Sequence, residues 1–103
     1  MARAVQRPAA RRDFIIHYAY IAEKAGLETG KRFRQAVESA YAFLAKMPRM
    51  GVPFKIKGGK HAGVRLWRVR GFKDYLIAYR PYRGGVRIER LVHAKQDYRR
   101  ILK

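Results

Sequence analysis

Residues 64–92 read VRLWRVRGFKDYLIAYRPYRGGVRIERLV, and this stretch decides the fold. It holds three segments rich in β-branched and aromatic residues, a composition typical of β-strands. The segments are separated by short stretches that contain Gly, Pro or Asp, which favour turns. The stretch therefore predicts three consecutive antiparallel strands. The strands are expected at residues 64–69, 75–80 and 86–92, with turns at residues 71–74 and 81–85.

The last of these strands has an alternating pattern of apolar and charged residues. Successive side chains of a strand point to opposite faces of its sheet. The pattern therefore predicts one buried face and one largely charged face. The buried set is Val86, Ile88 and Val92, and the other set is Arg87, Glu89 and Leu91.

Upstream of the strands, apolar residues recur at spacings of three and four, which indicates two amphipathic helices. The first is expected over residues 8–25, because Pro8 suits a first helical turn and Gly26 suits the position after the last one. The second is expected from Glu28 or Thr29 to Met47. With a link of three or four residues, the two helices should form an antiparallel hairpin.

The remaining segments complete an α+β domain. Residues 2–6 suit a short first strand, residues 48–63 a basic loop, and residues 97–103 a short terminal helix capped by Asp97. The expected order is β-α-α-β-β-β followed by a short C-terminal helix. The helical hairpin should cover one face of a small antiparallel sheet, and the other face should be basic.

The composition excludes several classes of protein. The 103 residues suffice for a single domain over 1–103, and 49% hydrophobic residues are too many for a disordered chain. The absence of Cys excludes disulfides, a thiolate nucleophile and a cysteine-based zinc site. With only 3 His and 7 acidic residues, neither a metal nor another cofactor is expected.

The distribution of apolar residues along the sequence favours a cytoplasmic protein without a membrane partner. No stretch approaches the roughly 18 apolar residues that a membrane-spanning helix needs. The basic N-terminus lacks the apolar run of a signal peptide.

The charge is large and uneven. The formal net charge is +18, and residues 51–103 hold 15 Lys and Arg against 3 acidic residues, a net of +12. Sixteen of the 25 cationic residues are Arg, whose planar guanidinium pairs two-pronged with carboxylate or phosphate. The composition therefore predicts a docking surface for an anionic partner and leaves its class open.

Six short motifs lie along nearly the whole chain. They are PAARRDF at 8–14, GKRF at 30–33, MPRMG at 47–51, GVR at 63–65, YLIAYR at 75–80 and ERLVHAKQD at 89–97. In this order and spacing they resemble the RelE/ParE superfamily of toxins from bacterial type II toxin–antitoxin modules. The ending from His93 to Asp97 is similar to the His-Gly-x-Arg-Asp ending of the ParE type, with Ala94 and Gln96 in place of Gly and Arg.

The resemblance implies the toxin of a plasmid-stabilisation module, closer to ParE than to RelE. A ParE-like toxin poisons DNA gyrase without acting as a nuclease. It is held by a cognate acidic antitoxin, ParD-like, in a hetero-oligomer. The antitoxin would lay apolar side chains along the helical hairpin and sheet, and its acidic side chains would meet Arg.

The candidate residues fall into two groups. Candidates for the target are the strand cations and the strand-end histidine: Arg65, Arg68, Arg80, Arg90 and His93. Candidates for the antitoxin are Tyr18, Phe33, Val37, Tyr41, Arg65 and Tyr79.

Two alternatives stay open. A RelE-like toxin would cut mRNA on the ribosome, and it would need His93 for proton transfer with Arg65 and Arg80 stabilising the phosphate charge. His93 could instead satisfy a local hydrogen bond with the backbone or with Asp97, and Arg65 could form an internal salt bridge with Asp74 or Glu89. The second alternative is a small basic nucleic-acid-binding module that has no antitoxin.

Overall fold

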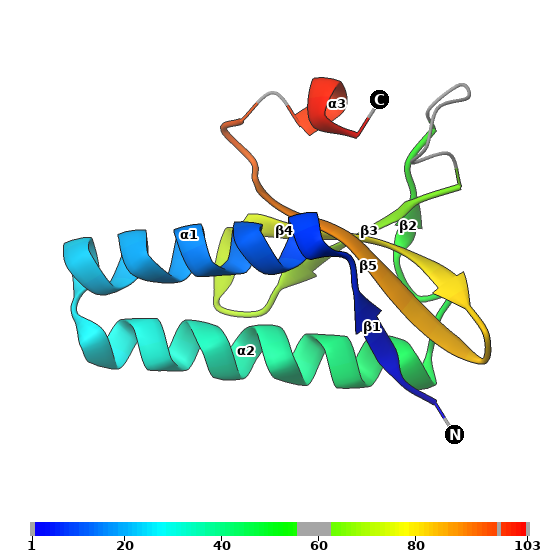
Figure 1. Cartoon of the computed structure of the whole chain (residues 1–103), viewed down its shortest axis with the longest axis horizontal. Coiled ribbons are helices and arrows are strands. Elements are labelled where there is room, and N and C mark those ends of the chain that lie inside the picture. The colour runs from blue at the N-terminus through cyan, green and yellow to red at the C-terminus, as the bar shows by residue number, and fades with distance from the viewer. Residues whose placement is uncertain (1, 56–62, 97, 103) are drawn as a thin grey trace.

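The computed structural model describes residues 2–55, 63–96 and 98–102, and its element order follows the predicted one (Figure 1). The elements are β1 (Ala4–Gln6), α1 (Pro8–Ala25), α2 (Leu27–Lys46), β2 (Val52–Pro53), β3 (Arg65–Val69), β4 (Phe72–Tyr82), β5 (Gly85–His93) and α3 (Tyr98–Ile101). The cap expected from Asp97 lies outside the described residues.

The two long helices form the predicted hairpin and lie side by side in Figure 1. Their link is shorter than expected, because Gly26 alone separates them. The N–H of Gly26 donates to the carbonyl of Ala22 at 3.1 Å, and its carbonyl accepts from the N–H of Gly30, also at 3.1 Å. The φ angle of Gly26 is +97°, a conformation that favours glycine, so one residue ends α1 and starts α2.

The strands form one five-stranded sheet in the order β1-β5-β4-β3-β2. The pairings of β3 with β4 and of β4 with β5 are antiparallel, as predicted, and β2 pairs antiparallel with β3. Strand β1 pairs parallel with β5, with Ala4 opposite Val86, so the sheet is mixed. Strand β2 lies inside the segment that the sequence indicated as a loop.

The turn between β4 and β5 is tighter than the sequence suggested. Pro81 and Tyr82 belong to β4, and only Arg83 and Gly84 remain in the turn. Both turn residues have positive φ angles, +47° and +79°, as a two-residue hairpin turn of type I′ requires. Likewise β4 already begins at Phe72, so the expected turn over residues 71–74 shrinks to its first part.

Strand β5 carries an irregularity that overturns one prediction. Ala78 pairs with Arg90 but Tyr79 pairs with Ile88, so Glu89 is an extra residue, a β-bulge. The bulge shifts the alternation by one residue. The assignment of Leu91 to the charged face was therefore wrong, because Leu91 is buried in the same cluster as Ile88.

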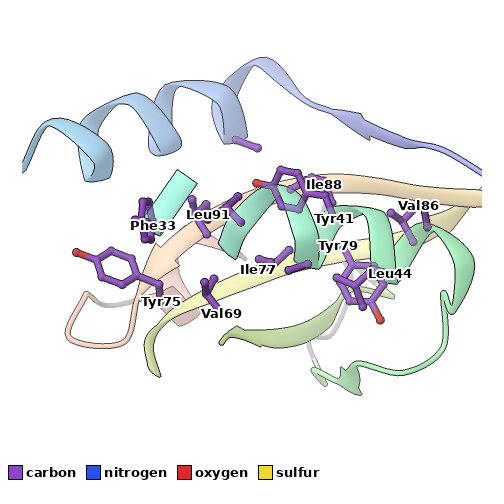
Figure 2. Close-up of a cluster of buried hydrophobic side chains, with 14 of the residues drawn as sticks. Phe33, Tyr41, Leu44, Val69, Tyr75, Ile77, Tyr79, Val86, Ile88 and Leu91 are labelled. Carbon is purple, nitrogen blue, oxygen red and sulfur yellow. The ribbon is translucent and has the colours of Figure 1, made fainter. Parts of the chain in front are cut away.

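The main core lies between the helical hairpin and one face of the sheet (Figure 2). Phe33 of α2 is fully buried in this core. Its ring contacts three others, with centroid distances of 5.9 Å to Phe14, 5.1 Å to Phe72 and 4.9 Å to Tyr75. This core fixes the hairpin on the sheet.

The opposite face of the sheet is less open than expected. Val64, Ala78 and Leu102 form a second buried cluster, and Phe54, Leu66 and Tyr98 pack around it. The C-terminal segment with α3 therefore covers part of the face that was predicted to be basic.

Candidate interaction sites

The carboxylate of Glu89 on β5 lies close to three arginine side chains. Glu89 is fully buried, and its Oε1 lies 2.9 Å from Nη1 of Arg7. Its Oε2 lies 2.7 Å from Nε of Arg87 and 3.5 Å from Nε of Arg80. Burial opposes ionisation of Glu89, but the hydrogen bonds from Arg7 and Arg87 outweigh it and hold the pKa of Glu89 below its ordinary value.

The bulge makes this cluster possible. Arg80 and Arg87 are direct cross-strand partners, a pairing of like charges that is destabilising without a counter-charge. The extra residue Glu89 places its carboxylate beside both. Next to them, the guanidinium carbons of Arg83 and Arg87 lie 5.2 Å and 5.1 Å from the ring centroid of Tyr82. This end of the β4–β5 hairpin therefore carries a surplus of positive charge.

Arg90, another target candidate, ties the first helix to the sheet. Its Nε and Nη2 donate to the two oxygens of Asp13, at 2.7 Å and 3.0 Å. The N–H of Leu91 donates to the same carboxylate at 3.0 Å. The hydrogen bonds from Arg90 to Asp13 raise the pKa of Arg90. Arg90 thus fixes α1 on β5 through a bidentate pair.

Arg65 and Tyr79 hold the segment that follows α2. Nη1 of Arg65 donates to the carbonyls of Arg49 and Gly51, at 3.1 Å and 2.7 Å. The Tyr79 hydroxyl donates to the carbonyl of Pro48 at 2.9 Å and accepts from the N–H of Gly51 at 2.7 Å. Arg65 is therefore engaged by backbone carbonyls and not by the carboxylate of Asp74 or Glu89 that the sequence suggested. Arg68 is exposed and donates to the carbonyl of Lys73.

His93 lies at the end of β5 and makes local contacts. Its Nδ1 accepts the N–H of Lys95 at 3.0 Å, and its ring packs edge-on against Tyr75 at 4.8 Å. Tyr75 also makes an edge contact with His17 of α1, at 5.0 Å. His17 donates from Nε2 to the carbonyl of Leu91 at 2.9 Å. Burial lowers the pKa of His17 and outweighs that hydrogen bond.

The three residues of the nuclease alternative do not converge. Arg65 is opposite Tyr79 and His93 is opposite Tyr75, so both share the helix-covered face. Tyr75 and Tyr79 are four residues apart in one strand, a separation of about 13 Å. Arg80 follows Tyr79 and points to the opposite face.

Most antitoxin candidates lie inside the protein. Phe33, Val37, Tyr41 and Tyr79 belong to the core between hairpin and sheet, so in this fold they present little or no surface to a partner. Tyr18 is half-buried beside Phe14, with 5.9 Å between the ring centroids. The apolar residues at helical spacing lie in the core. Their spacing alone does not distinguish a core position from a binding position.

A groove between α2 and β3 was not foreseen. It has a volume of about 590 Å³ and is lined by Arg32, Gln35, Ala36, Ser39, Ala40, Phe43, Trp67 and Arg70. Phe43 remains 39% exposed, and its ring centroid lies 5.5 Å from that of Trp67. The available signal was a partly exposed aromatic residue, Phe43, on the same helix face as Ala36 and Ala40.

Residues 2–55, 63–96 and 98–102 contain neither a metal-binding cluster nor a membrane-spanning helix. In these ranges no three His, Asp or Glu side chains gather as a metal site would require. No helix there is long and apolar enough to cross a membrane.

Comparisons with known proteins agree with this fold. Residues 5–98 match the family model described as "ParE toxin of type II toxin-antitoxin system, parDE". A solved structure from the chromosomal ParDE toxin–antitoxin system of P. aeruginosa superposes with a TM-score of 0.73 at 16% sequence identity, over 92% of this chain and 98% of that chain. At this identity the superposition establishes the shared fold. No curated protein matches the chain significantly.

Proposed function

The chain belongs to the ParE toxin family of type II toxin–antitoxin systems, and from this we propose that it inhibits DNA gyrase and is neutralised by a ParD-like acidic antitoxin. The motif resemblance found in the sequence is confirmed by the family match. The gyrase target and the antitoxin are carried over from the resemblance, and the structure is consistent with both.

The observation that favours a gyrase inhibitor over a nuclease is the dispersion of the candidate catalytic residues. Cleavage of RNA requires a proton-transfer group and phosphate-binding cations around one phosphate. Here Arg80 is held at Glu89 on one face, while Arg65 and His93 lie far apart on the other. The described residues therefore support a toxin that acts by binding.

The charge supports an acidic partner. Seven acidic residues stand against 25 Lys and Arg, and Glu89 and Asp13 are already engaged by Arg7, Arg87 and Arg90. A compact domain with this imbalance is destabilised by its own repulsion. An acidic antitoxin that covers part of the surface would relieve the repulsion and form a hetero-oligomer.

A supercoiling assay tests the target. We expect the purified protein to inhibit supercoiling by gyrase at stoichiometric excess, and the acidic protein encoded by the neighbouring gene to restore it. Arg68→Glu, on the exposed sheet surface, should weaken inhibition more than Arg34→Glu on the outer side of α2, which changes the charge equally. Unaltered supercoiling at stoichiometric excess would contradict the gyrase proposal.

A second assay tests the RelE-like alternative directly. The protein is incubated with translating ribosomes and a defined mRNA, and the RNA ends are mapped. We expect no cleavage at ribosome-positioned codons. Cuts that disappear in His93→Ala would establish the mRNA endoribonuclease instead.

A further inference from the structure

A pocket lies where the end of α2 meets the β4–β5 turn, at one end of the molecule (Figure 1). Its lining consists of two short segments, residues 46–50 and residues 81–85. Its volume is about 610 Å³, and sites for small molecules typically measure about 300–1,000 Å³. The pocket shares no lining residue with the groove between α2 and β3. It is therefore a separate site of a size that suits one small molecule.

Both segments of the pocket are held in place from behind. The Tyr79 hydroxyl donates to the carbonyl of Pro48 at 2.9 Å and accepts from the N–H of Gly51 at 2.7 Å. On the other side, Gly85 lies so close to the start of the chain that a Cβ there would overlap the carbonyl oxygen of Arg3. The two walls are thus fixed before any ligand arrives, which lowers the entropic cost of binding.

The charged residues of the lining are all cationic, namely Lys46, Arg49 and Arg83. All three are exposed, and none of them forms a salt bridge within residues 2–55, 63–96 and 98–102. The guanidinium of Arg83 lies over the ring of Tyr82, at 5.2 Å from its centroid. This contact uses the flat face of the guanidinium and leaves its in-plane N–H groups for an acceptor. The pocket therefore suits a ligand with phosphate groups.

The rest of the lining is mostly apolar. Met47 and Met50 keep 48% and 47% of their surface exposed, and Pro48, Pro81 and the ring of Tyr82 lie with them around the pocket. Methionine side chains are polarisable and adapt to the shape of an aromatic surface. A nucleobase is a flat aromatic surface of this kind. The lining thus combines a place for a base with cations for phosphates.

The charge of the pocket favours a free nucleotide over a strand of nucleic acid. A strand brings one phosphate charge for each nucleotide. A nucleoside di- or triphosphate concentrates several charges in one small molecule, which matches three cations in one pocket. A second copy of this chain is a poor occupant, because each copy has a net charge of +18 and the two would repel.

We propose that this pocket binds a nucleoside di- or triphosphate. The base lies against Met47 and Met50, and the phosphates pair with the three cations of the lining. The site is additional to gyrase inhibition and to the antitoxin, and it depends on neither of them.

Calorimetric titration of the purified full-length protein tests the proposal. The probe is ATP, and the control is inorganic tripolyphosphate, which carries the phosphates without a base. At constant ionic strength, we expect the dissociation constant of ATP to be lower than that of tripolyphosphate by about tenfold or more. Equal affinities would mean that the protein attracts polyanions without recognising a base. That result, or a lack of ATP binding, would overturn the proposal.

Three variants locate the site. Arg49→Glu reverses a charge of the pocket and should raise the dissociation constants of ATP and tripolyphosphate by about tenfold or more. Arg34→Glu reverses an exposed charge on α2 outside the pocket and should raise them much less. Met50→Ser should weaken the binding of ATP and leave that of tripolyphosphate unchanged. Circular dichroism checks that each variant is folded. Equal effects of the two arginine substitutions would overturn the proposal.

A single-stranded deoxythymidine oligonucleotide distinguishes a nucleotide site from a nucleic-acid site. We expect the oligonucleotide to bind through the overall charge of the protein, so that Arg49→Glu and Arg34→Glu weaken it equally. Oligonucleotide binding that depends on both Arg49 and Met50, in a protein that does not bind ATP, would assign the pocket to nucleic acid and overturn the proposal.

Discussion

The two faces of the sheet are stabilised in different ways. On the face under the hairpin, Phe33 and its neighbours form one continuous apolar core. On the other face, near the β4–β5 turn, three arginines surround the single buried carboxylate of Glu89. The first arrangement depends mainly on packing, whereas the second depends on charge. Substitutions on the two faces should therefore differ in size and in their dependence on pH and salt.

The largest effect is expected in the apolar core. Phe33→Ala removes a fully buried ring that contacts three other rings, and it should lower the free energy of unfolding by about 3–5 kcal/mol. Phe43→Ala deletes the same group at a half-exposed position and should cost much less. Urea denaturation of both variants measures the difference, and equal losses would contradict the assignment of Phe33 to the core.

The next largest loss of stability is expected on the face of the sheet that carries Glu89 and its arginines. Glu89→Gln leaves three guanidiniums without their counter-charge and should lower the free energy of unfolding by about 2–3 kcal/mol, less than for a fully buried pair because the arginines are partly exposed. The matched control is Glu38→Gln, which neutralises an exposed carboxylate on α2 and should have little effect.

The same pair of variants gives a pH signature. The pKa of Glu89 is lower in the folded protein than its ordinary value of 4.5. Its contribution is therefore complete above about pH 4.5 and is lost as the pH falls through the folded pKa. The difference in stability between wild type and Glu89→Gln should shrink over this acid range, and a difference that is independent of pH would argue against the ionic cluster.

Two buried tyrosines offer a matched comparison on the helix side. Tyr79→Phe removes a hydroxyl that makes two hydrogen bonds to the segment after α2, and it should cost about 1–2 kcal/mol. Tyr41 has a buried hydroxyl that finds no hydrogen-bond partner in the described part of the chain. Tyr41→Phe should therefore be neutral or stabilising. Thermal denaturation of the two variants compares them, and a loss of stability in Tyr41→Phe would indicate an additional contact.

The smallest effect is a pH dependence of stability on the helix side of the sheet. His17 donates to the carbonyl of Leu91, and burial lowers its pKa below 6.5. The unfolded chain therefore binds a proton at a higher pH than the folded one, so stability should fall as the pH decreases from about 6.5 to the folded pKa. In His17→Gln this decline should be absent. Unfolding curves of the wild-type protein and of His17→Gln, each measured at pH 7.5 and at pH 5.5, test this expectation.

Much of the fold could be predicted from local signals. The first helix has the bounds predicted from Pro8 and Gly26, since both residues act on the backbone next to them. The bulge at Glu89 could not be predicted, because it depends on how two strands pair. Arg7, one partner of Glu89, is 82 residues away in the sequence, and no local pattern links the two.

The candidate sites were harder to predict than the fold. Apolar spacing placed Phe33 and Val37 on one face of the second helix and led to their selection as antitoxin candidates. Whether neighbours in the same chain or a partner cover such residues is decided only by packing. The groove appears where Ala36 and Ala40 of one helix meet Trp67 of a distant strand. The groove exists because of the distance between α2 and β3 in the fold, and this distance cannot be derived from the amino-acid composition.

The parallel pairing of β1 with β5 has a consequence for biosynthesis. Residues 4–6 are made long before their partners, residues 86–88, which follow far along the chain. The Glu89 cluster likewise forms only after Glu89 has been made, because Arg7 binds the carboxylate of that residue. Contacts between such distant segments form late in folding. A ribosome in the middle of this message therefore carries an incomplete sheet, and the finished toxin surface first exists after the last strand has emerged.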